Sequence, residues 1–235
     1  DPEMSRGLGD VYKRQIMNIG ENPGVNNGKN GENFVILRSI IMEMTGKLKE
    51  YDRIIMGIDP GTRVMGYGVL GIRGRKPEVI VQGVIKLDRF ESHYLRLHRI
   101  YERVESLAAQ YLPDEVALEA PFFGKNIQSM LKLGRAQGVA MAACLARDIP
   151  IAEYAPRLVK MAVTGNGQAS KEQVANMVQH LLRIPQSQMP TLLDATDAVA
   201  VALTHFYETA KPTATAKAPK SWAEFIAKNP DKLAH

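Results

Sequence analysis

The segment RIIMGIDPGTRVMGYGVL, residues 53–70, constrains the fold more than any other part of the sequence. Its two apolar runs stand on either side of a short polar break, a pattern that predicts two strands joined by a tight turn. Asp59 closes the first run and is followed at once by Pro60 and Gly61. Asp-Pro-Gly is ordinary turn chemistry, so Asp59 is either a turn residue or a carboxylate held rigidly at a strand end.

The rest of the central sequence predicts a mixed α/β sheet. Three strands follow one another first, at residues 53–59, 64–71 and about 78–87. Two further strands, at 115–120 and 149–155, alternate with segments of helical periodicity. These predicted helices span residues 92–112, 126–148, 156–163, 170–182 and 190–210.

The two ends of the chain differ in composition from this centre. Residues 1–52 include NIGENPGVNNGKNGEN, which is rich in Gly and Asn. We therefore expect an N-terminal extension that is disordered or not native to the protein. Residues 53–210 form the expected folded domain. Residues 211–235 contain a Pro/Ala/Lys linker and a short amphipathic tail, which packs on the domain, docks a partner or stays disordered.

Composition excludes several classes of protein. The single cysteine, Cys144, rules out an internal disulfide framework or a cysteine-rich zinc site and fits a reducing cytoplasm. The sequence contains neither the roughly 18 consecutive apolar residues of a membrane span nor a secretory signal. The net charge of +5 divides into −1 for residues 1–52, +3 for 53–210 and +3 for 211–235. This mild excess is compatible with nucleic acid binding but does not indicate it.

Further carboxylates stand at the ends of apolar elements. Glu119 closes the strand VALEA, and Asp194 and Asp197 interrupt the apolar helix LLDATDAVAVA. Being three residues apart, the two aspartates share a helix face. Each acid has a simpler explanation: Asp59 as a turn residue, Glu119 as a solvated strand end, and the aspartate pair as a complement to the helix dipole.

Taken together, the four acids favour a metal site. Burying like charges is costly unless a cation neutralises them. Ligands that are all oxygen, without clustered His or Cys, point to a hard cation such as Mg²⁺ or Mn²⁺. Four carboxylates around two such ions are typical of phosphoryl-transfer sites.

Five motifs give the chain a family resemblance. In order, they are GIDPGTRVMGYGV, ALEAPFFGKN, LKLGRAQGVA, EYAPRLVKMAVTGNGQASKEQV and LLDATDAVAVALTH. Over about residues 53–208 the chain resembles the RuvC-type Holliday junction resolvases. This resemblance implies a ribonuclease H-like fold, with a mixed five-stranded sheet flanked by helices. It also implies an endonuclease that resolves four-way DNA junctions by paired symmetric nicks, in recombination and repair.

The resemblance assigns roles to the four acids. Asp59, Glu119, Asp194 and Asp197 are implied to be the catalytic residues and the ligands of two Mg²⁺ ions, with Mn²⁺ as an alternative. Asp59 would bridge the ions, with Glu119 on one and the helical pair on the other. The implied products are a 5′-phosphate and a 3′-hydroxyl.

The resemblance also suggests DNA contacts. Phe122 is implied to stack on bases at an opened junction, although adjacent aromatics are also common core anchors. Lys160 and Lys171 match positions that contact phosphates, and Arg63 and Lys125 are further candidates beside the carboxylate strands. The Gly-rich loop TGNGQASK offers backbone N–H groups to a phosphate as well. The histidines lack ligand spacing, and we interpret them as structural or surface residues: His93, His98, His180 and His205.

The expected partners follow from the same resemblance. They are four-way junction DNA, a second copy of the chain, and the branch-migration complex of RuvA and RuvB. The helix at 126–148 is rich in small residues, which permit close helix approach in the core or across a homodimer interface. Alternative functions are another ribonuclease H-fold nuclease acting on RNA or other nucleic acid, a nucleotide-binding protein of the actin/Hsp70 or sugar-kinase type, and a catalytically inactive binding module.

Overall fold

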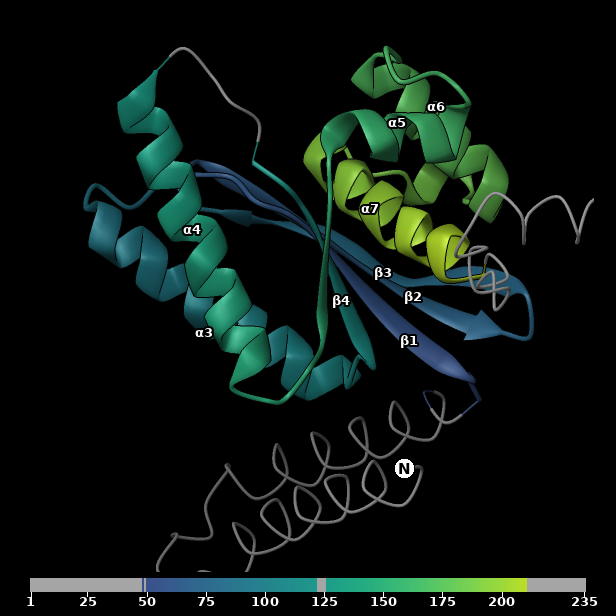
Figure 1. Cartoon of the computed structure of the whole chain (residues 1–235), viewed down its shortest axis with the longest axis horizontal. Helices are drawn as coiled ribbons and strands as arrows, with labels where there is room; N and C mark the ends of the chain where they lie inside the picture. Colours follow the sequence, from purple (N-terminus) through teal and green to yellow (C-terminus); the bar gives the residue numbers. More distant parts are fainter. Residues whose placement is uncertain (1–47, 49, 122–125, 211–235) are drawn as a thin grey trace, which may run out of the picture. The chain divides into compact units, whose positions relative to one another are not determined.

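The computed structural model of the chain describes residues 48, 50–121 and 126–210 (Figure 1). The predicted tail at 211–235 lies outside these residues, as does nearly all of the predicted extension at 1–52. Residues 50–52 are described, and the Asp52 N–H donates to the Ile72 carbonyl oxygen at 2.8 Å. Among the residues described, no helix is long and apolar enough to cross a bilayer.

Five strands form one mixed sheet, which confirms the predicted fold class. The strands are β1 (Arg53–Asp59), β2 (Val64–Arg73), β3 (Lys76–Lys86), β4 (Glu115–Glu119) and β5 (Ile151–Tyr154). Their order in the sheet is β3-β2-β1-β4-β5. The first three strands pair antiparallel, whereas β1 with β4 and β4 with β5 pair parallel. The central strand β1 therefore has an antiparallel neighbour on one side and a parallel neighbour on the other.

Helices cover both faces of the sheet. They are α3 (His93–Tyr111), α4 (Ile127–Leu145), α5 (Pro156–Thr164), α6 (Lys171–Leu182), α7 (Leu193–Ala210) and a short 3₁₀ turn at Gln186–Gln188. Figure 1 shows α3 and α4 on one side of the strands and α5, α6 and α7 on the other. Ser170 caps α6, because its hydroxyl accepts from the Gln173 N–H while the Gln173 side chain accepts from the Ser170 N–H.

Helix α7 is the centre of the fold. Every residue from Ala195 to Phe206 is buried, and the helix contacts all five strands as well as α5 and α6. Most of these residues are small or β-branched, so the helix lies close to the sheet. A Cβ at Gly57 of β1 would overlap the carbonyl oxygen of Ala198, and one at Gly66 of β2 would overlap that of Asp194. These two glycines therefore set how closely α7 approaches the sheet.

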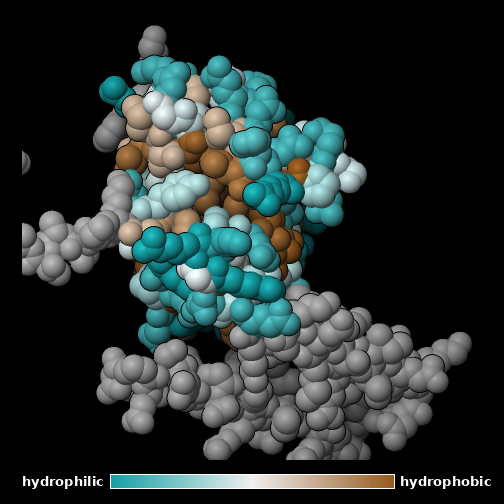
Figure 2. All heavy atoms as spheres, turned by 90° about the vertical axis from the view of Figure 1, so that its right-hand side faces the viewer, coloured by the Kyte–Doolittle hydropathy of each residue, from teal (hydrophilic) through white to brown (hydrophobic). Residues whose placement is uncertain are grey.

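The core on the α7 face extends to the molecular surface. Figure 2 views the molecule from the side of α5 to α7 and shows apolar atoms gathered near the middle of this face, with polar atoms around them. Val79, Met189 and Tyr207 are among the partly buried residues that pack against the core cluster. The helices on this face thus enclose the core incompletely.

Candidate active site at the end of β1

Strand β1 delivers Asp59 to the face of the sheet that α7 covers. Ile55 belongs to the core cluster shared with α7, and Gly57 meets the backbone of Ala198. Side chains alternate between the two faces along a strand, so Asp59, two residues beyond Gly57, faces α7 as well. The partly buried Asp59 is the last residue of its strand, and it is not an exposed turn residue.

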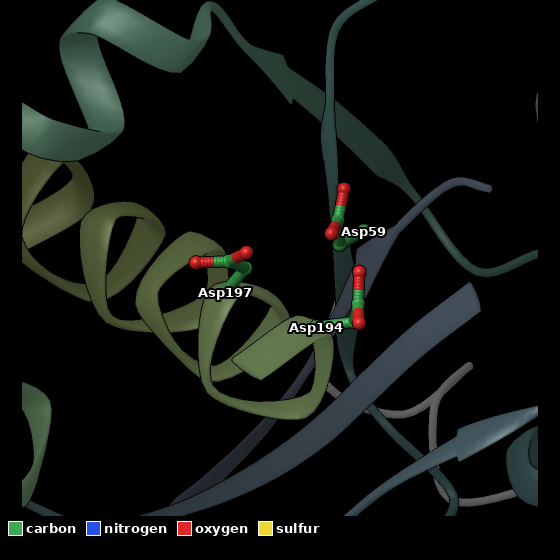
Figure 3. Close-up of side chains that lie close together, drawn as sticks. All are labelled: Asp59, Asp194 and Asp197. Carbon is green, nitrogen blue, oxygen red and sulfur yellow. The ribbon is translucent and has the colours of Figure 1, made fainter. Parts of the chain in front are cut away.

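The two aspartates of α7 lie beside Asp59. Gly66 is the register partner of Asp59 in β2, and its missing side chain lets the Asp194 backbone come to this point. One carboxylate oxygen from each of Asp59, Asp194 and Asp197 lies within 4.8 Å of the other two. Figure 3 shows Asp59 at the end of β1, with Asp194 of α7 next to it and Asp197 further along α7.

Burial and mutual repulsion oppose ionisation of these acids. Burial raises the pKa of Asp59 from its ordinary 3.8 to about 8, and the charges of Glu119 and Asp197 add to this rise. Burial also raises the pKa of Asp197. The pKa of Glu119 rises from 4.5 to about 7, through burial first and then the charge of Asp197. Near neutral pH the folded protein therefore carries these charges together only at a cost, which a cation would relieve.

Glu119 stands next to the group of three rather than inside it. It closes β4, the parallel neighbour of β1, and it is close enough to raise the pKa of Asp59. Its own oxygens lie outside the 4.8 Å group. The structure therefore brings three of the predicted acids together directly and places the fourth at their edge.

Lys171 is held by two of the acids. Its ammonium group donates to Asp197 Oδ2 at 2.6 Å and lies 3.7 Å from Asp194 Oδ1. These contacts raise the pKa of Lys171 against the opposing effect of its burial. The positive charge of Lys160 partly offsets the rise in the pKa values of Glu119 and Asp197, so Lys160 also lies near this group. Lys160 and Lys171 therefore both border the acidic group.

The other predicted DNA contacts are less informative. Arg63 is exposed between β1 and β2, and its carbonyl oxygen accepts from the N–H groups of Leu87 and Asp88. Phe122 and Lys125 lie outside the described residues. Their roles stay predictions.

A basic cluster that was not predicted from the sequence lies between α3 and α4. His93 and Arg96 lie in the first turns of α3, and Lys132 and Arg135 lie in the first half of α4. Burial lowers the pKa of His93, and the charges of Arg135, Lys132 and Arg96 lower it further. These four residues are therefore close together in space. Two basic pairs at three-residue spacing, on consecutive helices, were the signal in the sequence that could have indicated this cluster.

Several hydrogen-bond donors of this cluster have no partner among the residues described. Among the residues described, Lys132 and Arg135 make neither a hydrogen bond nor an ion pair, and the buried Nε2 of His93 has no hydrogen-bond partner. Arg96 is fixed by the backbone, since its Nε donates to the Phe90 carbonyl oxygen at 2.7 Å. The cluster thus presents positive charge without an acidic partner in the described part of the chain, which favours an external anion.

The acidic group fits a hard divalent cation. Within the described residues, its members offer only carboxylate oxygens, the ligands that Mg²⁺ and Mn²⁺ prefer. Burial first, and the neighbouring acidic charges second, raise the pKa values of Asp59 and Glu119, so the protein alone stabilises the ionised carboxylates poorly. A bound cation would favour the ionised form of each acid.

Fold and site together define a class of protein. A mixed sheet in this order, with acids from the central strand and from the C-terminal helix meeting at one end, is that of a metal-dependent nuclease with a ribonuclease H-like fold. The family model "Crossover junction endodeoxyribonuclease RuvC" matches residues 55–205. The chain belongs to the RuvC family of crossover junction endodeoxyribonucleases.

Individual relatives agree with this assignment. The chain is 59% identical over 184 residues to the RuvC of Porphyromonas gingivalis, a match that covers 77% of this chain and 97% of the relative. It is 59% identical over 182 residues to the RuvC of Bacteroides fragilis, covering 77% and 96%. Among solved structures, Thermus thermophilus RuvC in complex with a Holliday junction substrate has a TM-score of 0.61 at 35% identity, covering 66% of this chain and 94% of that one.

Proposed function

We propose that this protein resolves four-way DNA junctions by two symmetric nicks, one in each of two opposed strands, in recombination and repair. The observation that carries the proposal is the meeting of Asp59, Asp194 and Asp197, with Glu119 beside them, in a chain of the RuvC family. The T. thermophilus relative was solved with a Holliday junction substrate, which supports the same substrate here.

Two Mg²⁺ ions are the proposed cofactor, with Mn²⁺ able to replace them. Asp59 would be shared by both ions, Glu119 would hold one, and the aspartates of α7 would hold the other. Bound ions would lower the pKa of the attacking water and stabilise the leaving 3′ oxygen, giving a 5′-phosphate and a 3′-hydroxyl. The protein's own part is to keep the carboxylates at fixed positions on two strands and a buried helix, so that little reorganisation is needed.

Lys171 and Lys160 are the proposed phosphate contacts at the site. The Lys171 ammonium group already lies among the acids, 2.6 Å from Asp197 Oδ2, so it neutralises part of their charge. A cation bound by the same oxygens would compete with this ion pair and leave the lysine for a nearby DNA phosphate. Phe122, Arg63 and Lys125 remain proposed contacts around the junction.

Without divalent cations, the protein should lose stability as the pH rises from about 4 to 8. Asp59 has a pKa of about 8 in the folded protein and 3.8 ordinarily. In this window the folded state keeps a proton that the unfolded state has lost, so the free energy of unfolding falls with rising pH. Glu119, with a pKa raised from 4.5 to about 7, acts in the same direction. The expected loss is on the order of 1–4 kcal/mol.

Chemical denaturation at several pH values in the presence of a chelator measures this loss. Asp59→Asn provides the control, because it removes the largest contribution and should flatten the profile. Millimolar Mg²⁺ should restore stability to the unchanged protein at pH 8. A wild-type profile that is flat or rises over this range would contradict the proposed charge accumulation.

The basic cluster is proposed to bind the phosphates of a junction arm. Replacing both Lys132 and Arg135 by alanine should weaken junction binding about tenfold or more at physiological salt and reduce the salt slope by about 2. Fluorescence anisotropy over a salt series, with Ca²⁺ in place of Mg²⁺, would measure both quantities. The matched control replaces Arg75 and Lys76 by alanine. Both are exposed at the β2–β3 turn, at the end of the sheet opposite to Asp59. Equal losses in the two double variants would argue against a localised contact.

A homodimer through α4 is proposed as the acting form. An exposed stripe of apolar and small residues runs along this helix at spacings of three and four: Ile127, Leu131, Gly134, Gly138, Ala142 and Leu145. Ile127 and Leu131 are 73% and 57% exposed, and added Cβ atoms at the two glycines would meet nothing described within 4 Å. Such a stripe suits close packing against a second helix. A two-fold symmetric dimer would bring one active site to each opposed strand.

Leu131→Glu should convert the protein to monomers. Burying a carboxylate at the centre of an apolar helix pair costs several kcal/mol, so the dimer dissociation constant should rise at least about a hundredfold. Sedimentation velocity over a concentration series would measure the change. Leu181→Glu on α6, where the leucine is 39% exposed, serves as the control. A Leu131→Glu variant that stays dimeric would place the interface elsewhere.

Coupling to a RuvA and RuvB complex and a cytoplasmic location are proposed from the family alone.

The experiment that tests the function is cleavage of a synthetic four-way junction with Mg²⁺, beside a linear duplex and an RNA–DNA hybrid. Paired symmetric nicks in the junction alone are the expected result. Preferential cleavage of the hybrid would instead favour an RNA-directed nuclease of the same fold. Failure to cut any of the three, with the metal bound, would overturn the proposal.

A further inference from the structure

Each element that carries a site acid also carries a polar residue well away from that acid, toward the other end of the element. Strand β1 begins at Arg53 and ends at Asp59, and β4 begins at Glu115 and ends at Glu119. Helix α7 carries Asp197 in its first half and His205 in its second. The distance along α7 between these two is about 12 Å at 1.5 Å per residue, and that along β4 is about 13 Å.

These distal residues are hydrogen-bonded to one another. The Glu115 carboxylate accepts from the Arg53 guanidinium and from His205 Nε2. The hydroxyl of Tyr154 lies 2.7 Å from His205 Nδ1, and Arg53 also donates to Thr209 Oγ1 of α7 at 2.9 Å. The contacts therefore join β1, β4, β5 and α7 at one place, which we call the distal network (Arg53, Glu115, Tyr154 and His205).

The chemistry of the network fixes its geometry. Burial raises the pKa of Glu115, but hydrogen bonds from Arg53 and His205 outweigh this effect and lower it. An ionised carboxylate only accepts hydrogen bonds, so His205 Nε2 carries a hydrogen, while Nδ1 pairs with the Tyr154 hydroxyl. Both nitrogens of this ring, which is 6% exposed, are thus satisfied in a single orientation of the ring.

Alternation along the strands connects the network to the acids. Arg53, Ile55, Gly57 and Asp59 share the α7 face of β1, and Glu115 and Glu119 share one face of β4. Tyr154 is the register partner of Glu119, so its backbone lies beside the site while its hydroxyl reaches the network. A shift of α7 along the sheet would break the His205 contacts at the same time as it moved Asp194 and Asp197.

We propose that the distal network is a positioning device, which holds α7 in one register against β1 and β4 and thereby sets the spacing of the metal-binding carboxylates. The inference rests on the proposed function of these carboxylates. In it, Arg53, Glu115, Tyr154 and His205 are positioning residues, acting through the elements they connect and not through contact with the substrate. Their removal should therefore change metal binding more than junction binding.

The test measures metal affinity without using activity. His205→Phe keeps a buried ring and removes both hydrogen bonds, and the melting temperature is followed as Mg²⁺ is added. The Mg²⁺ concentration at the midpoint of this melting-temperature shift, called the Mg²⁺ midpoint below, should rise by about tenfold to a hundredfold. This is the range found when groups that orient metal ligands are lost. In cleavage assays kcat should fall by a similar factor, while the KM for the junction stays within about twofold of the wild-type value.

Three further variants separate positioning from general stability. Tyr154→Phe removes one hydroxyl and should shift the Mg²⁺ midpoint in the same direction but less, which keeps the test open if His205→Phe does not fold. Glu115→Gln keeps an accepting oxygen for His205 and should remain close to wild type. Val178→Ala in the core on α6 lowers stability without touching the network, and its Mg²⁺ midpoint should be unchanged.

Two outcomes would overturn the inference. One is a Mg²⁺ midpoint that stays unchanged in both His205→Phe and Tyr154→Phe. The other is a midpoint that moves equally in Val178→Ala, because the effect would then follow stability alone. Failure of the proposed function would look different from failure of this inference. If the wild-type protein bound Mg²⁺ but left the junction uncut, the proposed function would fail, and the Mg²⁺ midpoints of the variants could still be compared.

Discussion

Asp59→Asn should abolish junction cleavage while leaving the protein folded. The substitution keeps the size of the side chain and removes the charge at the point where β1, β4 and α7 bring their carboxylates together. Metal ions in such sites supply several kcal/mol of transition-state stabilisation. Since about 1.4 kcal/mol corresponds to a tenfold change in rate, cleavage should fall at least about a thousandfold. Single-turnover kinetics on a synthetic junction, with saturating protein, would measure the loss.

The control for this prediction is Asp88→Asn. Asp88 is exposed, and its carboxylate accepts only a local hydrogen bond from the Arg89 N–H at 3.1 Å among the contacts described. This variant should cut at the wild-type rate. The Asp59→Asn protein should still bind the junction and should melt at a higher temperature than wild type when metal is absent. Cleavage within about tenfold of wild type would mean that Asp59 is not a metal ligand.

Gly57→Ala should destabilise the protein severely. The added methyl group would overlap the Ala198 carbonyl oxygen and crowd Ala202, and a backbone oxygen inside a buried helix cannot rotate away. Overpacking of this kind typically costs about 1–3 kcal/mol, and a clash with backbone belongs at the upper end. A loss of about 3 kcal/mol corresponds to a fall of about 6–12 °C in melting temperature for a domain of this size. Thermal and denaturant unfolding measured by circular dichroism would test it.

Gly134→Ala gives the matched comparison. This glycine also lies within a regular element, but nothing described lies within 4 Å of an added Cβ. Alanine favours a helix over glycine by about 1 kcal/mol, so at low protein concentration the variant should be as stable as wild type or more so. If both variants lost stability equally, the close approach of α7 to β1 would not be the reason for a glycine at position 57.

The sequence predicted the strands and helices well because their periodicities are local. Each run of alternating or helically spaced apolar residues lies within a single element, and strong stop signals such as Pro60-Gly61 separate the elements. The acids Asp59 and Glu119 were predictable for the same reason, since each closes an apolar strand. That the acids of α7 meet Asp59 was predicted from the shared position of the acids at the ends of apolar elements and from the family resemblance, and not from local periodicity, because the contact joins residues more than 130 positions apart.

Features that depend on packing between distant segments escaped the sequence analysis. The ion pair of Lys171 with Asp197 exists because α6 packs on α7, and nothing in the local sequence around Lys171 indicates it. His205 was interpreted only as a structural or surface histidine, and its partners Glu115 and Tyr154 lie 90 and 51 positions away. Long-range polar contacts of this kind leave no periodic signal in a single sequence.

The burial of Ala195–Phe206 in α7 has a consequence for motion in this protein. A helix that contacts all five strands cannot open without separating the sheet from its covering helices, so its amide hydrogens should exchange with solvent only through global unfolding. Asp197 lies within this buried stretch, and Asp194 directly precedes it. Local fluctuations of the native state therefore do little to move them.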